Sequence, residues 1–247
     1  MAEYDFAAQR LFVDSDLAAD ALVPLERQAA HYLLSVLRLG AGDAIHVFNG
    51  RDGEWRAVVE PSGRKAAHLR VGSRVREQTA RPDLALLFAP LKHARLDYMV
   101  QKAVEMGVSE LRPVLTRRTV ATRVNLERMR ANAVEAAEQC GVLALPGIVP
   151  EARLPQALDA LPADRLVVFC DEDAPVVDPV AALASAGPAV GFALVIGPEG
   201  GFDPSEREAI LARPRVCRLS LGPRILRADT AAVAALAVLQ SALGDWR

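Results

Sequence analysis

Residues 194–203 read LVIGPEGGFD, and they place a turn with three glycines and a proline directly after a hydrophobic run. Glycine loses more conformational freedom on folding than any other residue, so this composition indicates a turn with special backbone requirements. In the following DPSEREAILA, Asp203 and Glu206 fit a capping box and Pro204 suits a first helical turn. The stretch therefore predicts a strand, a turn and a helix, with free backbone N–H groups and a positive dipole end offered to a ligand.

The spacing of this turn excludes two phosphate-binding motifs. It is not GxGxxG, and no GK[ST] follows it, so neither the dinucleotide fingerprint nor the P-loop applies. A tight structural turn would also explain two of the glycines. The motif by itself leaves a ligand loop and a structural turn open.

The chain from residue 84 onward alternates between short apolar runs and helical patterns. Short, mainly apolar runs are typical of strands buried on both faces of a parallel sheet. Strands are predicted at residues 84–90, 111–115, 165–170, 192–196 and 216–221. Helices are predicted over 93–107, with Leu96, Met99, Val100 and Ala103 on one face, and over 125–141, from an Asn125 cap to Gly141. The pattern predicts an α/β domain.

Open α/β sheets bind ligands beyond the carboxyl ends of their strands. We therefore expect a site where GPEGG and a second loop, LGPRILRADT at 221–230, leave their strands. That second loop places Arg224 and Arg227 beside Asp229. An alternative interpretation is that Asp229 or Thr230 only caps the alanine-rich helix that follows and the arginines are solvated. The alanines favour close packing within the fold or at a dimer interface.

The first 75 residues are predicted to be rich in β-structure. Strands are expected at 10–13, 44–48, 54–60 and 66–72, separated by the turn signals NGRDG (49–53) and PSG (61–63). One short helix is expected within 25–43, from the helical spacing of Leu33, Val36 and Leu37. This predicts a small barrel or sheet. The charged, proline-containing stretch at 75–83 marks a boundary between domains at 1–75 and 76–247.

Composition narrows the class of protein. The chain has 247 residues, 51% of them hydrophobic, but no apolar run of the roughly 20 residues that a membrane span needs. Its first ten residues lack the apolar core of a signal peptide, so a cytoplasmic location is expected. The cysteines Cys140, Cys170 and Cys217 are expected to be buried and inert. The four histidines lack metal-ligand spacing, and no metal is expected.

Arginines are concentrated in two segments although the net charge is −2. Residues 112–130 hold six arginines and one acid, and residues 213–227 hold five arginines and no acid. Arginine is well suited to phosphate and base contacts, so the segments favour RNA binding. A coding bias towards arginine and alanine explains them equally well, and composition leaves both open.

Five stretches occur in the order of one known family. RLFV (10–13), HYLLSVLRLGAGD (31–43), LFAPLKHARLDYMVQKAVEMGV (87–108), GPEGGF (197–202) and LGPRILRADTA (221–231) resemble the RsmE family, the 16S ribosomal RNA uridine N3-methyltransferases of the SPOUT class. The resemblance covers nearly the whole chain. It implies a small PUA-like RNA-binding β-barrel followed by an α/β SPOUT methyltransferase domain with a carboxyl-terminal trefoil knot, and a homodimer. S-adenosylmethionine is the implied cofactor, and 16S RNA of the small ribosomal subunit is the implied partner, without DNA or membrane.

The resemblance also assigns residues. The implied cofactor-binding residues are Ile196, Gly197, Gly200, Gly201, Leu219, Leu221, Gly222, Ile225 and Leu226, with Cys170 to Glu172 as a further contributor. Arg227 would stabilise the negative charge on uracil O2 and O4 as the N3 proton leaves, and Asp229 or Glu199 would orient it or accept the proton, with Asp229 preferred. RNA contacts are expected from Arg10, His31, Arg38 and Lys92 together with the arginine-rich segments.

Two positions depart from the family pattern. Val142 stands in EQCGVLALP where the family has arginine, and Asp229 stands in LRADTA where it has glutamate. The first change loses a charge and the second keeps it. Three alternatives remain: methylation of another RNA or of a ribose 2′-oxygen, a non-catalytic RNA-binding or ribosome-assembly factor, and a metabolic enzyme with another nucleotide cofactor.

Overall fold

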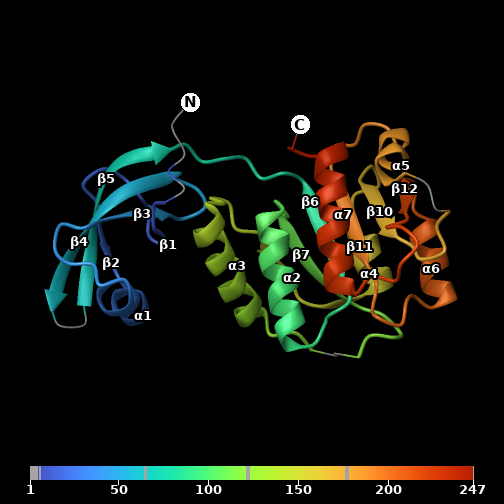
Figure 1. Cartoon of the computed structure of the whole chain (residues 1–247), viewed down its shortest axis with the longest axis horizontal. Coiled ribbons are helices and arrows are strands. Elements are labelled where there is room, and N and C mark those ends of the chain that lie inside the picture. Colours follow the sequence, from blue (N-terminus) through green and yellow to red (C-terminus); the bar gives the residue numbers. More distant parts are fainter. Residues whose placement is uncertain (1–4, 6, 64–65, 121–122, 176–177, 247) are drawn as a thin grey trace. The chain divides into compact units, whose positions relative to one another are not determined.

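The computed structural model describes residues 5, 7–63, 66–120, 123–175 and 178–246 (Figure 1). The chain divides into two compact units. The first contains residues 1–80 and 137–145, and the second contains residues 81–136 and 146–247.

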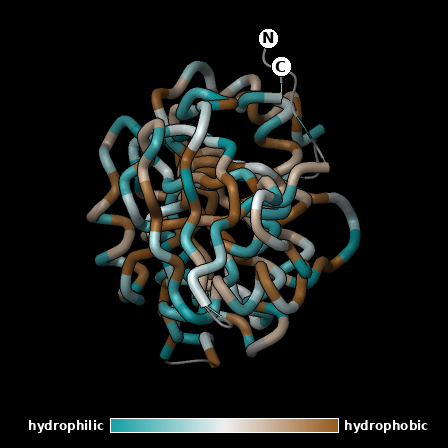
Figure 2. The backbone as a smooth tube through the Cα atoms, turned by 90° about the vertical axis from the view of Figure 1, so that its left-hand side faces the viewer, coloured by the Kyte–Doolittle hydropathy of each residue, from teal (hydrophilic) through white to brown (hydrophobic). Residues whose placement is uncertain are grey.

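The first unit is built on a five-stranded sheet of order β1-β3-β4-β5-β2. Its strands are β1 (Arg10–Phe12), β2 (Leu22–Pro24), β3 (Ala44–Phe48), β4 (Glu54–Gly63) and β5 (Ala66–Arg76). The pair β1 and β3 is parallel, and the others are antiparallel. Buried residues recur at every second position over residues 57–60 of β4 and 66–71 of β5. Figure 2 shows hydrophobic and hydrophilic residues interspersed along the backbone. The four predicted strands are confirmed, whereas β2 is too short to give a pattern. The turn predicted at 61–63 is wrong, because β4 continues through these residues.

The predicted helix of this unit has an unexpected geometry. It consists of α1 (Arg27–His31) and a wider π-helical turn over Tyr32–Val36, in which the N–H of Leu37 donates to the carbonyl of Tyr32 at 2.9 Å. Leu33 is fully buried, as its spacing predicts. Val36 is 58% exposed and Leu37 is half-buried, so the three residues of the predicted spacing do not share one buried face. The extra residue in the π turn rotates Val36 away from the core.

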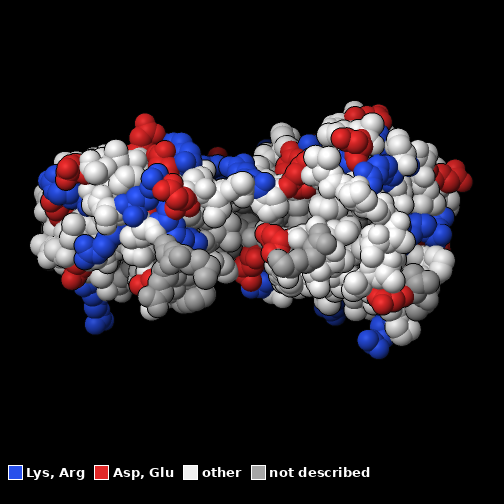
Figure 3. Space-filling model, turned by 90° about the horizontal axis from the view of Figure 1, so that it is seen from above, with Lys and Arg blue, Asp and Glu red and all other residues white. Residues whose placement is uncertain are grey.

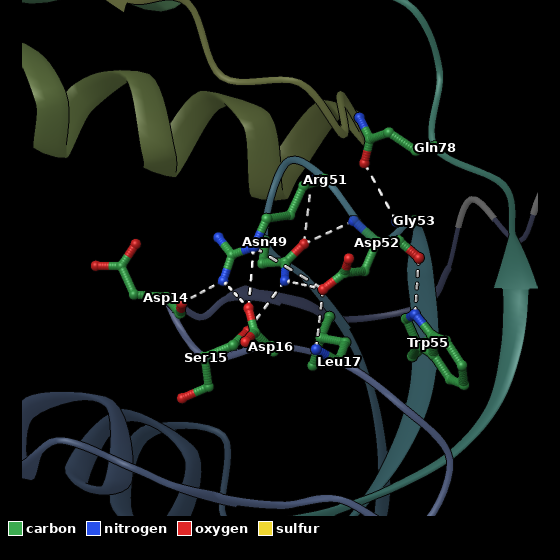
Figure 4. A network of polar contacts seen from close by, with 10 residues as sticks. All are labelled: Asp14, Ser15, Asp16, Leu17, Asn49, Arg51, Asp52, Gly53, Trp55 and Gln78. Carbon is green, nitrogen blue, oxygen red and sulfur yellow. Dashed lines mark hydrogen bonds and ion pairs between the residues drawn. The ribbon is translucent and has the colours of Figure 1, made fainter.

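The turn predicted at NGRDG is confirmed, and Figure 4 shows the contacts that hold it. The Asn49 side-chain oxygen accepts the backbone N–H groups of Arg51 and Asp52 at 3.1 and 2.9 Å. The Asn49 amide donates to the carbonyl of Ser15 at 3.0 Å, and Arg51 forms an ion pair with Asp16 at 2.7 Å. The turn is therefore fastened to the segment that follows β1.

The second unit contains a parallel sheet of order β12-β10-β11-β6-β7-β8, with β9 paired to β7. Its strands are β6 (Leu84–Phe88), β7 (Glu110–Leu115), β8 (Gly147–Ile148), β9 (Ala152–Arg153), β10 (Leu166–Cys170), β11 (Phe192–Ile196) and β12 (Val216–Leu219). The strands β6, β10 and β11 are almost entirely buried. This confirms the α/β class and the five long strands predicted for it.

Helices cover both faces of this sheet (Figure 1). One face packs on α4 (Leu154–Asp159) and α6 (Pro204–Leu211), where Phe169 and Val195 join one cluster with Leu158 and Ile210. The helices α2 (His93–Glu105), α5 (Pro179–Ser185) and α7 (Ala228–Ala242) pack along the other face.

The helix α3 (Leu126–Cys140) begins in the second unit, and its last four residues belong to the first. The Asn125 side chain accepts the N–H of Arg128 at 3.0 Å, so the predicted cap is confirmed. In the described part of the chain, no helix has both the length and the apolar character that crossing a membrane requires.

Candidate functional site

Three loops of the second unit meet at the carboxyl edge of its sheet. The strands β10, β11 and β12 are neighbours and run in parallel, with Cys170 opposite Leu219 and Phe169 opposite Val195. The loops that follow them line a cavity of about 600 Å³, which also contacts the first turn of α7. This is the place where the sequence predicts a ligand site, since parallel strands bring their following loops to one edge.

Most residues expected to bind a cofactor line this cavity. They are Ile196, Gly197, Gly201, Leu219, Leu221, Gly222, Ile225 and Leu226. Cys170, Asp171 and Glu172 line it as the third loop, and so does Glu199. Gly200, Arg227 and Asp229 are not among the described residues that line it. Gly200 lies in the GPEGG turn beside the cavity, and Arg227 and Asp229 flank the lining residue Ala228.

The local geometry of the GPEGG turn requires glycine at two of its positions. The N–H of Gly201 donates to the carbonyl of Pro198 at 2.9 Å, and Gly201 has a φ of +71°, which side-chain-bearing residues rarely adopt. A Cβ on Gly201 would lie 2.6 Å from a Glu172 carboxylate oxygen, and one on Gly197 would lie 2.7 Å from the Phe202 ring. Glycine at 197 and 201 therefore lets backbone and side chains approach closely around the cavity.

The helix that follows the turn begins as the sequence predicts. The Asp203 carboxylate accepts the N–H of Ser205 at 3.1 Å, and the Glu206 carboxylate accepts the N–H of Asp203 at 3.1 Å, which completes the capping box. Hydrogen bonds from the Ser205 hydroxyl and N–H hold the pKa of Asp203 below its usual value. Glu206 also accepts the N–H of Arg117 at 2.8 Å, so the cap joins the segment after β7 to α6.

Two arginines contact the exposed side of the turn. Arg95 of α2 forms an ion pair with Glu199. Arg118, from the segment after β7, donates to the carbonyl of Gly200 at 2.7 Å and also lines the cavity. The sequence does not reveal these contacts, because each joins residues more than 80 positions apart.

A buried carboxylate fixes the loop after β10. The Asp171 side chain is 2% exposed and accepts hydrogen bonds from Arg207 of α6 at 2.9 Å and from Arg218 of β12 at 2.6 Å. Burial raises the pKa of Asp171, but the bonds from Arg207, Arg218 and the N–H of Asp173 outweigh it and lower the pKa below its usual value. The ionised Asp171 thus ties the third loop to two neighbouring elements at the cavity.

The last loop presents its arginines to solvent. The helix α7 begins at Ala228 after an extended Arg227, whose side chain forms no cap. Asp229 and Thr230 lie inside the first turn, so the interpretation of either as the helix cap is wrong. Arg224 and Arg227 are exposed, and within the described ranges no ion pair or hydrogen bond of their side chains is recorded.

Most arginines of the two rich segments are engaged within the protein. Arg112 and Arg128 form ion pairs with Glu110 and Asp97, and Arg215 donates to the carbonyl of Pro188 at 2.7 Å. Figure 3 shows basic and acidic side chains close together on one face of the molecule. The local excess of positive charge therefore overstates what these segments offer to RNA.

The residues expected to contact RNA fall into two groups. Arg10 is buried, and its guanidinium binds Glu54 at 2.8 Å and the carbonyl of Ala8 at 3.0 Å. This placement does not support a direct contact of Arg10 with RNA, and we interpret it as structural. His31, Arg38 and Lys92 are exposed.

Val142, which replaces the arginine of the family pattern, is half-buried in the first unit. A different arginine lies next to it in the structure. Arg76 donates to the carbonyl of Gly141 at 2.7 Å and forms an ion pair with Glu54 at 2.5 Å. An arginine side chain is therefore still present beside this loop, but its charge is paired with that of Glu54.

The cysteines differ in burial. Cys217 is buried and Cys170 is half-buried, but Cys140 is exposed at the end of α3, so its predicted burial is wrong. Burial raises the pKa of Cys170 to about 12, with a smaller contribution from Cys217, so Cys170 carries a thiol and not a thiolate. Among the residues that the structure describes, no group of three or more His, Cys, Asp or Glu side chains could hold a metal ion.

Comparisons with known proteins define the class of the chain. Residues 78–240 match the model of an RNA methyltransferase domain, and residues 25–72 match that of an RNA methyltransferase PUA domain. The chain is 31% identical to the ribosomal RNA small subunit methyltransferase E of Synechocystis over 96% of this chain and 78% of the relative. It is 29% identical to the Rickettsia conorii protein of the same name over 92% and 93%. The chain belongs to the ribosomal RNA small subunit methyltransferase E (RsmE) family.

A solved structure resembles the whole chain. A Legionella pneumophila protein described as a methyltransferase, with its cofactor SAM bound, has a TM-score of 0.80 and 28% sequence identity, and the match covers 95% of this chain and 98% of that one.

Proposed function

We propose that the protein transfers a methyl group from S-adenosylmethionine to N3 of uridine 1498 in 16S ribosomal RNA. The observation that carries the proposal is the cavity enclosed by the three loops after β10, β11 and β12, with exposed Arg227 directly beside it. Membership in the RsmE family supports an RNA of the small ribosomal subunit as the substrate.

The cavity suits S-adenosylmethionine in size and lining. Its volume of about 600 Å³ falls within the range of roughly 300–1,000 Å³ that is common for small-molecule sites. Gly197 and Gly201 let the Phe202 ring and the Glu172 carboxylate pack against the turn, where a Cβ would collide with them, and both side chains form part of the cavity wall. The related Legionella structure, solved with SAM, supports the same cofactor. When bound, S-adenosylmethionine supplies an activated methyl group, so the protein needs no covalent nucleophile.

The residues beside the cavity suit proton removal from uracil. Loss of the N3 proton puts negative charge on O2 and O4, and we assign Arg227 to stabilise it. Arg227 also precedes the first turn of α7, where the helix dipole favours negative charge. Asp229, two residues further along the chain, is the preferred residue to orient Arg227 or accept the proton. Glu199 is less suited, because its carboxylate already pairs with Arg95.

Several further features belong to this proposal. We infer a SPOUT fold with a trefoil knot formed by the carboxyl-terminal loops, a closed PUA-like barrel within residues 1–75, a methyltransferase domain from residue 76, and a homodimer. The two family-model matches support the methyltransferase domain and the PUA-like domain, and the knot, the closed barrel and the homodimer rest on the resemblance to the RsmE family. His31, Arg38 and Lys92 are the proposed RNA contacts, since they are exposed. A substrate in the small subunit implies a cytoplasmic location.

Methyl transfer in vitro tests the proposed function. The purified protein is incubated with labelled S-adenosylmethionine and with small ribosomal subunits from a strain that lacks this modification. Mass spectrometry of the digested 16S RNA then identifies the product. We expect N3-methyluridine at one position. Detection of a 2′-O-methylated nucleoside instead would mean that the protein methylates the ribose oxygen and not N3. If no methyl group entered either subunits or naked RNA, the result would favour a non-catalytic RNA-binding factor.

A further inference from the structure

The GPEGG turn is held from outside at two consecutive residues. The carboxylate of Glu199 pairs with the guanidinium of Arg95, and the carbonyl of Gly200 accepts a hydrogen bond from Arg118 at 2.7 Å. The two arginines come from different elements, α2 after β6 and the segment after β7. The strand β6 pairs with β11, which leads into the turn, and β7 pairs with the other side of β6. The contacts therefore connect the turn to the elements that follow the next two strands of the sheet.

The composition of the turn explains why it needs such contacts. Glycine backbone samples many conformations, so a turn with three glycines is not rigid by itself. Its internal restraints are the hydrogen bond from Gly201 to Pro198 and the close packing of Gly197 against Phe202. Glu199 and Gly200 lie at the apex of the turn. Among the described residues, the Glu199 carboxylate pairs only with Arg95, and the Gly200 carbonyl accepts a hydrogen bond only from Arg118.

We propose that Arg95 and Arg118 are positioning residues that hold the GPEGG turn in its cofactor-binding conformation, with Glu199 as the anchor for Arg95. This rests on the proposed function, which assigns the cofactor to the cavity. The turn contributes Gly197, Pro198, Glu199 and Gly201 to that cavity. Any freedom that the turn regains must be lost again on binding, so removing the contacts weakens the cofactor complex.

The exposure of these contacts predicts which measured property changes when they are removed. The side chains of Arg95 and Glu199 are 37% and 64% exposed, and ion pairs this exposed contribute little to global stability. The loss is therefore expected in cofactor affinity and in local order, while the thermal unfolding temperature stays nearly unchanged.

Affinity for S-adenosylhomocysteine, measured by calorimetry on the full chain, tests the proposal. We expect Arg118→Ala to weaken binding about tenfold, as loss of a charge-assisted hydrogen bond allows. Arg118→Lys should recover part of the loss, because its ammonium can still donate to a carbonyl. Arg215→Ala is the matched control: Arg215 donates to the carbonyl of Pro188 at the same 2.7 Å but precedes β12, at the opposite edge of the sheet from the cavity. Its affinity should match that of the wild type.

A charge exchange tests the anchor role of Glu199. Arg95→Glu and Glu199→Arg should each weaken S-adenosylhomocysteine binding about fivefold, and the double exchange should restore binding to within about twofold and restore turnover with it. If the single variants bound as tightly as the wild type, or if the double variant showed no recovery, the proposed positioning role of Arg95 would be wrong. Restored binding would support the anchor role even if turnover stayed low, because low turnover would then mean that Glu199 also acts on the reaction itself.

Hydrogen–deuterium exchange of the cofactor-free protein separates this proposal from the proposed function. Amide exchange of the peptide at 196–203 should be faster in Arg118→Ala and Arg95→Ala than in the wild type and in Arg215→Ala. Unchanged amide exchange in the two variants would show that Arg95 and Arg118 do not order the turn, even if the wild type binds the cofactor. A wild type without cofactor affinity would remove the proposed function, while the exchange result would still decide whether the arginines order the turn.

Discussion

Alanine substitutions at the glycines of the GPEGG turn allow a prediction with an internal control. Gly201 has a φ of +71°, and a Cβ there would lie 2.6 Å from Glu172. The left-handed backbone costs an alanine roughly 1–2 kcal/mol, and the flexible Glu172 side chain can move aside. Gly200 has no such φ, and its Cβ would meet Arg118 atoms only at 3.6 Å or beyond, an ordinary contact distance. We therefore expect Gly201→Ala to cost about 1–2 kcal/mol and Gly200→Ala less than about 0.5 kcal/mol.

Thermal unfolding with a probe in the second unit measures this difference. A loss of about 1–2 kcal/mol lowers the unfolding temperature by roughly 2–8 °C for a chain of this size. Gly197→Ala adds a second comparison, because its Cβ would press on the Phe202 ring at 2.7 Å, and such overpacking costs about 1–3 kcal/mol. Equal unfolding temperatures for Gly200→Ala and Gly201→Ala, or a larger loss in Gly200→Ala, would refute the argument.

Three further predictions concern the cavity and the oligomer. Arg227→Ala should keep S-adenosylhomocysteine affinity within about twofold while turnover falls about 100-fold or more; steady-state kinetics with unchanged turnover would remove Arg227 from the reaction. Asp171→Asn should lower the free energy of unfolding by about 2 kcal/mol in urea titrations at pH 7. Because the folded-state pKa of Asp171 is lowered, this difference should be present above about pH 4 and shrink as the pH falls through that folded-state value, and a constant difference would contradict the ionised role. Light scattering should show a dimer, and Ile225→Asp, at a fully exposed apolar residue, should shift it towards monomer; a wild-type monomer would exclude the proposed homodimer.

The fold of the second unit could be predicted because its signals are local. The strands at Leu84–Phe88 and Phe192–Ile196 are apolar throughout, and burial on both faces requires that composition. The start of α6 could also be predicted from the sequence, because both members of its capping box lie within four residues. The short helices α4 and α5 carry too few residues to show a period of 3.6, and the π-helical turn at Tyr32–Val36 breaks that period.

The location of the site could be predicted more fully than its contacts. Loops after parallel strands must meet at one edge, so GPEGG and the loop at 221–230 were expected to lie together. Asp171 is different, because its pairing with Arg218 depends on β10 and β12 being neighbours. The order of the strands in the sheet cannot be predicted from the sequence of either segment. Arg10 shows the same limit, since its burial depends on Glu54, which is 44 residues away.

Charge along the chain was the least reliable guide to function. The segment at 213–227 has an excess of five positive charges, but Arg215 binds backbone carbonyls and Arg218 binds Asp171. Only geometry separates these from the exposed Arg224 and Arg227. An arginine count therefore estimates the charge available to RNA only after the internal partners are known.

The most direct test of the central claim is the nucleoside content of 16S RNA in cells. A bacterial strain deleted for its own methyltransferase of this family is analysed by mass spectrometry, with and without the gene for this protein. The account predicts that N3-methyluridine is absent from the deletion strain and reappears at position 1498 when the gene is supplied. Continued absence of N3-methyluridine in the presence of the well-expressed protein would contradict the assignment.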